Sequence, residues 1–337
     1  MLQPKRFLQQ LRPYHYSMKE YSIEKSDNGI KLVKYLGKVL SESTPSFIYK
    51  MLRKKNITLN DKKASGNEFL KDGDIIKIYL SNETFEKFSG KNSNPVTQDI
   101  TDEYKKLPPV VYEDENILIL NKPAGMLSQK SKDTDISLNE ICISYMLFKG
   151  ETDFQKLKLF KPSIVNRLDR NTMGIIVFAK TYSAANKLSK AFKERTIHKY
   201  YRCVVLGEVK EDMILGGSLT KDNARNIVTV SEDGDAKIQT DIHPIKSTGK
   251  FTLLEILLIT GKTHQIRAHL ASIGHPILGD FKYGNKEINN ILAKEFKIKH
   301  QMLISYRLVM PKLTDELETL SEREFTIQTP EIFERLL

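Results

Sequence analysis

Residues 165–174 read Val-Asn-Arg-Leu-Asp-Arg-Asn-Thr-Met-Gly and run directly into the apolar stretch Ile175–Phe178. The apolar stretch predicts a buried strand, so Asp169 lies in a loop at the mouth of that strand, between Arg167 and Arg170. Nearby positive charge favours the ionised form of a carboxyl group. The stretch therefore predicts a carboxylate available as a nucleophile or base, although a structural ion pair in a loop fits the same residues.

A second segment, Thr-Gly-Lys-Thr-His-Gln-Ile-Arg-Ala-His-Leu at 260–270, carries a cation in a comparable setting. Gly261 can turn the chain out of a strand, and Thr263 can cap a helix over residues 263–273. Arg267 projects beside the apolar stripe of that helix. It can therefore pair with an acid supplied by another part of the chain.

Strand-like and helix-like segments alternate from Pro108 onward. Apolar patterning predicts strands at 117–120, 174–179, 200–205 and 251–260, and helices at 184–192 and 263–273. Long hairpin-like strand pairs between isolated helices favour an α+β fold with a mixed sheet over a doubly wound one.

A smaller unit precedes this region. Helices are predicted over residues 32–40 and from Ser46, and strands at 57–59 and 75–80. The second helix has an apolar stripe on one side, and Lys50, Arg53 and Lys54 share the opposite face. A charged helix face is usually solvated surface, but a group of cations also suits phosphate contact.

The 337 residues divide into a basic tail at 1–17, the small unit at 18–88, a linker at 89–107 and a larger domain at 108–337. The tail lacks the apolar core of a secretory signal. An organellar presequence, a basic tail and an upstream start before Met18 all fit it.

The balance of charge points to a polyanionic partner. With 53 Lys and Arg against 42 Asp and Glu, the formal net charge is +11, and clustered cations gain free energy by displacing counterions from phosphates. No apolar run approaches the ~18 residues that span a bilayer, so no membrane partner is expected. Two cysteines without a CxxC pair favour a reducing cytoplasm.

The sequence lacks the common cofactor motifs. There is no GxGxxG after a strand and no GxxxxGK[ST], and His264 and His269 are five residues apart, which is not the spacing of a helical ligand pair. We therefore expect neither a nucleotide cofactor nor a metal.

Together the segments Arg-Leu-Asp-x-x-Thr-x-Gly at 167–174 and Thr-Gly-Lys-Thr-His-Gln-Ile-Arg-x-His at 260–269 resemble the RluA-type family of RNA pseudouridine synthases. Further matches follow in order along residues 110–311, including Leu-Asn-Lys-Pro-Ala-Gly at 120–125 and Lys-x-Tyr at 199–201. The resemblance implies the pseudouridine synthase fold, a mixed and largely antiparallel central sheet flanked by helices.

The resemblance also implies roles for individual residues. Asp169 matches the catalytic aspartate of the family, and Arg267 matches the arginine that pairs with it. Tyr201 matches the active-site tyrosine that packs on the target base, with Cys203 and Val205 expected on the same pocket face. Leu303 matches an apolar residue of the pocket, and Arg167 matches the basic residue that fills the gap left by the flipped nucleotide.

Residues 18–82 resemble the α-L RNA-binding domain first recognised in a ribosomal small-subunit protein. In that family the second helix and the adjoining turn lie along structured RNA. The implied RNA contacts are Lys50, Arg53, Lys54 and Lys55.

The combination most resembles the RluC-type enzymes of large-subunit ribosomal RNA. It implies a cytoplasmic monomer that isomerises uridine in RNA and needs no cofactor, because the reaction involves neither redox change nor net hydrolysis. Asn166 and Met173 depart from the usual His and Ser of the motif. A synthase acting on tRNA, an RNA-binding ribosome-assembly factor without catalysis, and a base-excising N-glycosidase remain as alternatives.

Overall fold

The computed structural model describes residues 16–89, 100–222, 227–231 and 236–337. They form two compact units, of which the first holds the described part of Met1–Val96 together with Phe154–Lys161, and the second holds the rest. The predicted tail at 1–17 lies outside the described residues, apart from the two residues that begin the first strand.

The first unit is a four-stranded antiparallel sheet with short helices, in the strand order β1-β4-β2-β3. The predicted helices and strands are all present, whereas strands β1 and β3 and helices α3 and α5 were not predicted. The elements are β1 (Tyr16–Ser22), α1 (Leu32–Val39), α2 (Pro45–Arg53), β2 (Ile57–Leu59), β3 (Lys62–Lys63), β4 (Ile75–Ser81), α3 (Asn82–Ser89) and α5 (Phe154–Leu159).

Helix α5 corrects the predicted domain limits, because it belongs to the first unit although it lies within 108–337. It buries Leu157, and Lys156 pairs with Glu24 at 2.7 Å. The linker predicted at 89–107 is also shorter than expected at its C-terminal end, because a 3₁₀ helix, η3 (Glu103–Lys106), packs on α4 (Leu138–Phe148) of the second unit.

The second unit is built on an eleven-stranded mixed sheet, in the path order β11-β10-β12-β13-β9-β14-β8-β6-β5. The pairing is antiparallel except between β8 and β14. This confirms the predicted fold class. The strands are β5 (Val110–Glu113), β6 (Ile117–Lys122), β7 (Ser163–Ile164), β8 (Met173–Ala179), β9 (His198–Leu206), β10 (Met213–Asp222), β11 (Ile227–Ser231), β12 (Ala236–Ser247), β13 (Phe251–Leu258), β14 (Leu303–Val309) and β15 (Glu324–Thr326).

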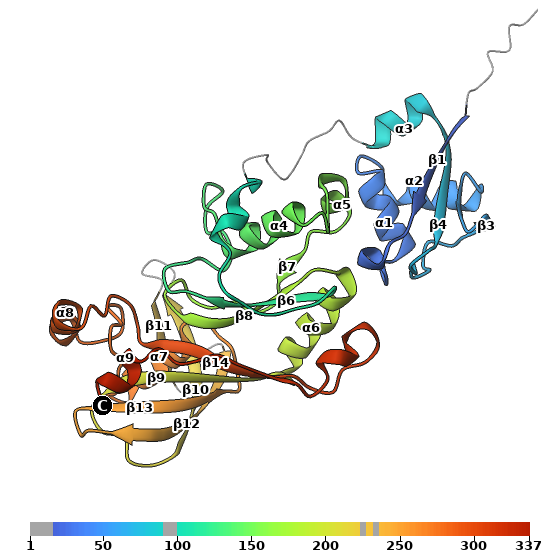
Figure 1. The fold of residues 1–337 in the computed structure, drawn as a ribbon. Helices are drawn as coiled ribbons and strands as arrows, with labels where there is room; N and C mark the ends of the chain where they lie inside the picture. Colours follow the sequence, from blue (N-terminus) through green and yellow to red (C-terminus); the bar gives the residue numbers. More distant parts are fainter. Residues whose placement is uncertain (1–15, 90–99, 223–226, 232–235) are drawn as a thin grey trace, which may run out of the picture. The chain divides into compact units, whose positions relative to one another are not determined.

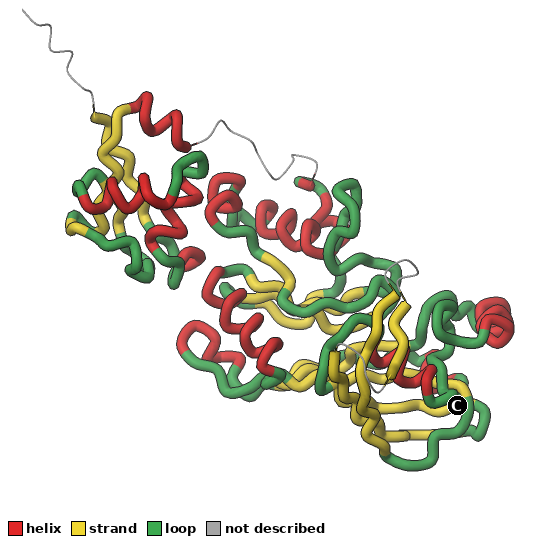
Figure 2. Tube along the Cα trace, turned by 180° about the vertical axis from the view of Figure 1, so that it is seen from behind, coloured by secondary structure: helices red, strands yellow, loops and turns green. Residues whose placement is uncertain are grey.

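Helices cover both faces of strands β6 and β8 (Figures 1 and 2). Helix α6 (Tyr182–Glu194) packs Ala184 and Leu188 against Ile175 and Val177 of β8, and α4 lies on the opposite face. Strand residues buried on both faces explain why β6 and β8 read as continuous apolar runs. The unit also contains α7 (Gln265–Ser272), α8 (Lys286–Glu295), the 3₁₀ helix η4 (Asp315–Leu320) and α9 (Ile332–Arg335).

Gly174 lies where β8 pairs with β14, between the strands β11 to β14 and the strands β8 to β5 of the sheet path. Its φ is +118°, and a Cβ at this position would lie 2.2 Å from the backbone oxygen of Ser305 on β14. The parallel pairing of β8 with β14 runs through this contact. Glycine is therefore required where the loop that carries Asp169 enters the sheet.

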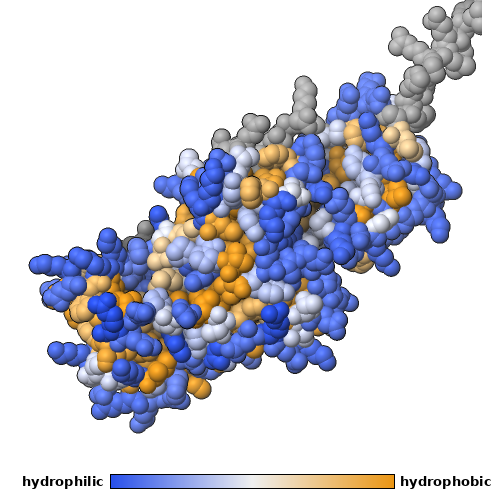
Figure 3. All heavy atoms as spheres, viewed as in Figure 1, coloured by the Kyte–Doolittle hydropathy of each residue, from blue (hydrophilic) through white to orange (hydrophobic). Residues whose placement is uncertain are grey.

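Among the described residues no helix has both the length and the apolar content needed to cross a bilayer. The face drawn in Figure 3 is largely hydrophilic, and its apolar side chains appear in patches between polar ones.

Candidate active site

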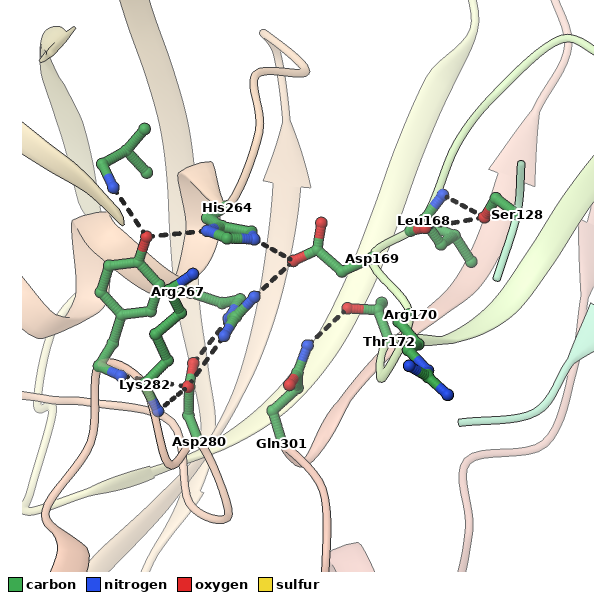
Figure 4. Close-up of polar contacts among 12 residues, drawn as sticks. Ser128, Leu168, Asp169, Arg170, Thr172, His264, Arg267, Asp280, Lys282 and Gln301 are labelled. Atoms are coloured by element: carbon green, nitrogen blue, oxygen red, sulfur yellow. Dashed lines mark hydrogen bonds and ion pairs between the residues drawn. The ribbon is translucent and has the colours of Figure 1, made fainter. Parts of the chain in front are cut away.

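The loop that carries Asp169 is held by the loop at 122–128. Ser128 Oγ donates to the carbonyl of Leu168 at 2.7 Å and accepts from its amide at 3.2 Å (Figure 4). Gly125 N–H donates to the carbonyl of Arg170, and Arg170 Nε donates back to the carbonyl of Gly125. These reciprocal bonds fix the backbone on both sides of Asp169.

Lys122 ties the same two loops together from inside the protein. Its fully buried ammonium donates to the carbonyls of Pro123, Met126 and Arg170 at 2.9–3.0 Å. Burial lowers the pKa of Lys122 to about 8, while the charge of Asp169 acts in the opposite direction. Lys122 lies in the Leu-Asn-Lys-Pro-Ala-Gly segment at 120–125, for which no role was predicted.

Asp169 and Arg267 meet, although 98 residues separate them. Arg267 Nη1 donates to Asp169 Oδ2 at 2.8 Å, and the carboxylate of Asp169 remains partly exposed. The guanidinium also binds Asp280 through two bonds, Nε to Oδ2 at 2.7 Å and Nη2 to Oδ1 at 3.0 Å (Figure 4). Burial lowers the pKa of Arg267, but the hydrogen bonds to Asp280 and the charges of both carboxylates outweigh burial and raise it.

Arg267, rather than either neighbouring arginine, is the ion-pair partner of Asp169. The guanidinium of Arg170 is committed to the carbonyl of Gly125, and the exposed Arg167 lines the pocket in front of Asp169. The ion pair of Asp169 therefore joins two segments that are distant in the sequence. Asp280, which orients that pair, was missed by the sequence analysis.

His264 approaches the same carboxylate. Its Nε2 lies 3.8 Å from Asp169 Oδ2, and its Nδ1 lies 2.8 Å from the hydroxyl of Tyr283. That hydroxyl also accepts from the amide of Val228, so the phenol of Tyr283 is held in place and orients the His264 ring with Nε2 facing Asp169. The pKa of His264 is lowered, chiefly by burial.

The start of helix α7 differs from the prediction. His264 occupies the N-cap position with φ +55°, and the helix begins at Gln265, so Thr263 does not cap it. The amide oxygen of Gln265 instead accepts from Thr260 Oγ1 and from the amide of Lys262. This tight turn directs both His264 and Arg267 toward Asp169.

A pocket of about 750 Å³ opens in front of Asp169. Tyr201 and Leu303 line it from the adjacent strands β9 and β14. Burial raises the pKa of Tyr201 to about 12, although a hydrogen bond with Ser305 acts to lower it. The phenol therefore stays protonated at neutral pH. The pocket thus combines an apolar wall, an aromatic ring and one carboxylate.

Cys203 and Val205 do not belong to the pocket, contrary to the prediction. They lie on the same face of β9 as Tyr201, but both are fully buried in the core with Ile266 and Leu270 of α7. Neither side chain is therefore open to the pocket, whereas Tyr201 is.

The four predicted RNA contacts of the small unit are all exposed. Lys50 and Arg53 lie on α2, whose apolar side buries Ile48 and Leu52, and Lys54 and Lys55 follow its end. Within the described residues, no group of three or more His, Cys, Asp and Glu side chains is arranged to hold a metal ion.

The fold and the pocket are those of an RNA-modifying synthase, and residues 116–272 match the family model described as RNA pseudouridylate synthase. The chain belongs to this family and is an RNA pseudouridine synthase of the RluA type, an isomerase. It is 34% identical over 272 residues to the ribosomal large subunit pseudouridine synthase C of Rickettsia typhi, covering 77% of this chain and 83% of that protein.

Two further comparisons agree. An uncharacterized RNA pseudouridine synthase of Mycoplasma genitalium is 32% identical over 302 residues, which is 87% of this chain and 90% of that protein. The structure of human RNA pseudouridylate synthase domain containing 4 superposes with a TM-score of 0.53 at 20% identity, over 70% of this chain and 94% of that chain, and supports the fold.

Proposed function

We propose that this enzyme isomerises specific uridines in large-subunit ribosomal RNA, with Asp169 as the catalytic carboxylate. The observation that carries the proposal is the partly exposed carboxylate of Asp169, bound by Arg267 at the mouth of the pocket. Similarity to the large-subunit synthases C of Rickettsia typhi and Vibrio vulnificus supports the choice of RNA.

In the proposed reaction, the bond between N1 of uracil and C1′ of ribose breaks, the base rotates, and C5 bonds to C1′. The proton on C5 is lost and N1 gains one, so the product is an isomer of the substrate. Asp169 acts by attacking C1′ or C6, or by removing the 2′ proton. Arg267 holds the carboxylate in place, and its bonds to Asp280 keep the guanidinium fixed.

The target base must leave its stack to reach Asp169, at a cost of a few kcal/mol. Stacking on Tyr201 returns roughly 1–3 kcal/mol, and Leu303 supplies an apolar contact. We assign to Arg167 the role of filling the gap that the flipped nucleotide leaves in the base stack of the RNA. The cations Lys50, Arg53, Lys54 and Lys55 of the small unit would hold flanking phosphates. We further propose that the enzyme acts as a cytoplasmic monomer, with its two buried free cysteines suited to a reducing compartment.

Carbodiimide-modified reverse-transcription mapping of total RNA, with and without the gene, tests the substrate. We expect a reverse-transcription stop in large-subunit ribosomal RNA that is lost when the gene is deleted and restored when a wild-type copy is supplied. A stop confined to tRNA would contradict the choice of RNA. Free uracil and an abasic product from purified enzyme would indicate an N-glycosidase, and no stop at all would favour an assembly factor.

A further inference from the structure

Lys199 is a buried cation that the reaction described above does not use. It lies on β9 two residues before Tyr201, so both side chains leave the same face of the strand. Both line the pocket, although Lys199 is only 9% exposed. Within the described part of the chain, its ammonium has no hydrogen bond and no ion pair.

The surroundings of Lys199 leave its charge uncompensated. Burial lowers the pKa of Lys199, and repulsion by Arg195 lowers it further. Among the described residues no carboxylate forms an ion pair with its ammonium. A buried charge without a counter-charge costs free energy. Such a charge facing a pocket is a candidate for a ligand-binding group.

Two backbone features hold the cations at this wall of the pocket. The ammonium of Lys199 lies 3.3 Å from the place where a Cβ of Gly261 would be, so the missing side chain gives it room. Arg195 ends helix α6 in the left-handed conformation, with φ +63°, and its exposed side chain lines the same pocket.

Asp169 is bound by Arg267 at 2.8 Å, and no hydrogen bond or ion pair joins it to Lys199. Lys199 and Arg195 are therefore pocket cations outside the catalytic pair. A neutral base carbonyl cannot relieve the repulsion between Lys199 and Arg195, whereas a full negative charge can.

We propose that Lys199 and Arg195 form a subsite for one phosphodiester of the RNA next to the target uridine. The proposal rests on the proposed function, since the phosphodiester is that of the RNA substrate. Charge-assisted bonds from lysine and arginine to a phosphate position the backbone without reading its sequence. The subsite would thus set the register that brings the uridine to Tyr201 and Asp169.

The test uses short RNAs that carry the mapped uridine, each with one neutral methylphosphonate linkage near it. The adjoining nucleotide is 2′-O-methylated in both the neutral and the charged versions. With the wild-type enzyme, one linkage should lower kcat/KM about tenfold or more when neutralised. On the charged RNA, Lys199→Gln should lower kcat/KM by a similar factor, and neutralising that linkage should then cause no further loss of kcat/KM. The control Lys250→Gln changes an exposed lysine outside the pocket, and its kcat/KM should still fall about tenfold when the linkage is neutralised.

Thermal unfolding of the free enzyme separates binding from a structural role. Because the charge is uncompensated, Lys199→Met should leave Tm unchanged or raise it, while Lys199→Arg should retain most of the RNA affinity. The proposal is overturned if Lys199→Gln remains sensitive at every linkage, or if Lys199→Met lowers Tm while RNA affinity is unchanged. Failure of the wild-type enzyme to form pseudouridine in any RNA would instead contradict the proposed function.

Discussion

Arg267 binds two carboxylates with different exposure, and this asymmetry defines their roles. Asp280 is buried and takes two bonds from the guanidinium, whereas Asp169 takes one and faces the pocket. Asp280 therefore fixes the arginine, and the arginine positions the carboxylate that we assign to chemistry. A lysine could not satisfy both partners, because it lacks the planar fork of donors.

Asp280→Asn tests this arrangement at the residue scale. The change keeps the shape but removes the buried counter-charge, so Arg267 loses its orientation. We expect the free energy of unfolding to fall by about 3 kcal/mol and kcat/KM to fall about 100-fold, measured by chemical denaturation and pseudouridine formation. Asp72→Asn, at an exposed carboxylate of the small unit, is the control. Parent-like values for Asp280→Asn would show that Arg267 needs no second carboxylate.

His269 gives the fold a pH dependence. It is buried on α7, bonded through Nδ1 to Thr240, and burial lowers its pKa to about 4. The unfolded chain takes up this proton near pH 6.5 and the folded chain does not, so the free energy of unfolding should fall between pH 6.5 and 4, by up to about 3 kcal/mol. His269→Gln should flatten this slope, and His198→Gln, at an exposed histidine, should not. Equal slopes in all three proteins would contradict the assignment.

The pairing of Asp169 with Arg267 could be predicted from the sequence because both residues lie in compact motifs. The sequence could not identify the role of Asp280, which depends on the segment after α7 folding back against that helix. The approach of His264 to Asp169 depends on a left-handed residue at the start of α7, and nothing in local periodicity predicts that conformation.

At the scale of elements, the junction of β8 with β14 is the most demanding contact. Gly174→Ala would place a methyl group against the backbone of Ser305 and impose a strained φ. We expect a loss of at least about 3 kcal/mol in the free energy of unfolding. Gly216→Ala on β10 has open space around the added methyl and should change stability by less than about 1 kcal/mol. The two variants would be compared by urea denaturation, and equal stabilities would refute the close contact.

Strands β6 and β8 could be predicted because they are buried on both faces and read as apolar runs, and β9 and β13 because their apolar residues cluster in short stretches. The neighbouring strands β10 and β12 were missed, since they mix glycines and charged residues with few apolar ones. Helix α5 could be placed only by its packing against the first unit.

At the scale of the whole molecule, the small unit adds cations outside the pocket. Replacing Lys50, Arg53 and Lys54 with Gln should weaken RNA binding and flatten its salt dependence, by about 0.7 in the log-log slope for each lost contact with single-stranded RNA and about 0.9 for a duplex. The measurement is single-turnover rate against RNA concentration at several salt levels.

An equal loss of charge elsewhere is the control for that variant. Replacing the exposed Lys286, Lys294 and Lys299 with Gln removes three positive charges from the second unit. If both triple variants shift the salt slope equally, net charge rather than the face of α2 attracts the RNA.

If the carboxylate of Asp169 performs the isomerisation, the substitution Asp169→Asn should abolish it. The purified variant and the wild-type enzyme would be incubated with the same RNA, and the nucleosides would be separated by chromatography and identified by mass. We predict that the wild-type enzyme converts uridine to an isomer of equal mass. The variant should bind the RNA and form no isomer, because every proposed route needs the carboxylate. Turnover by Asp169→Asn at a rate near that of the wild type would contradict the assignment.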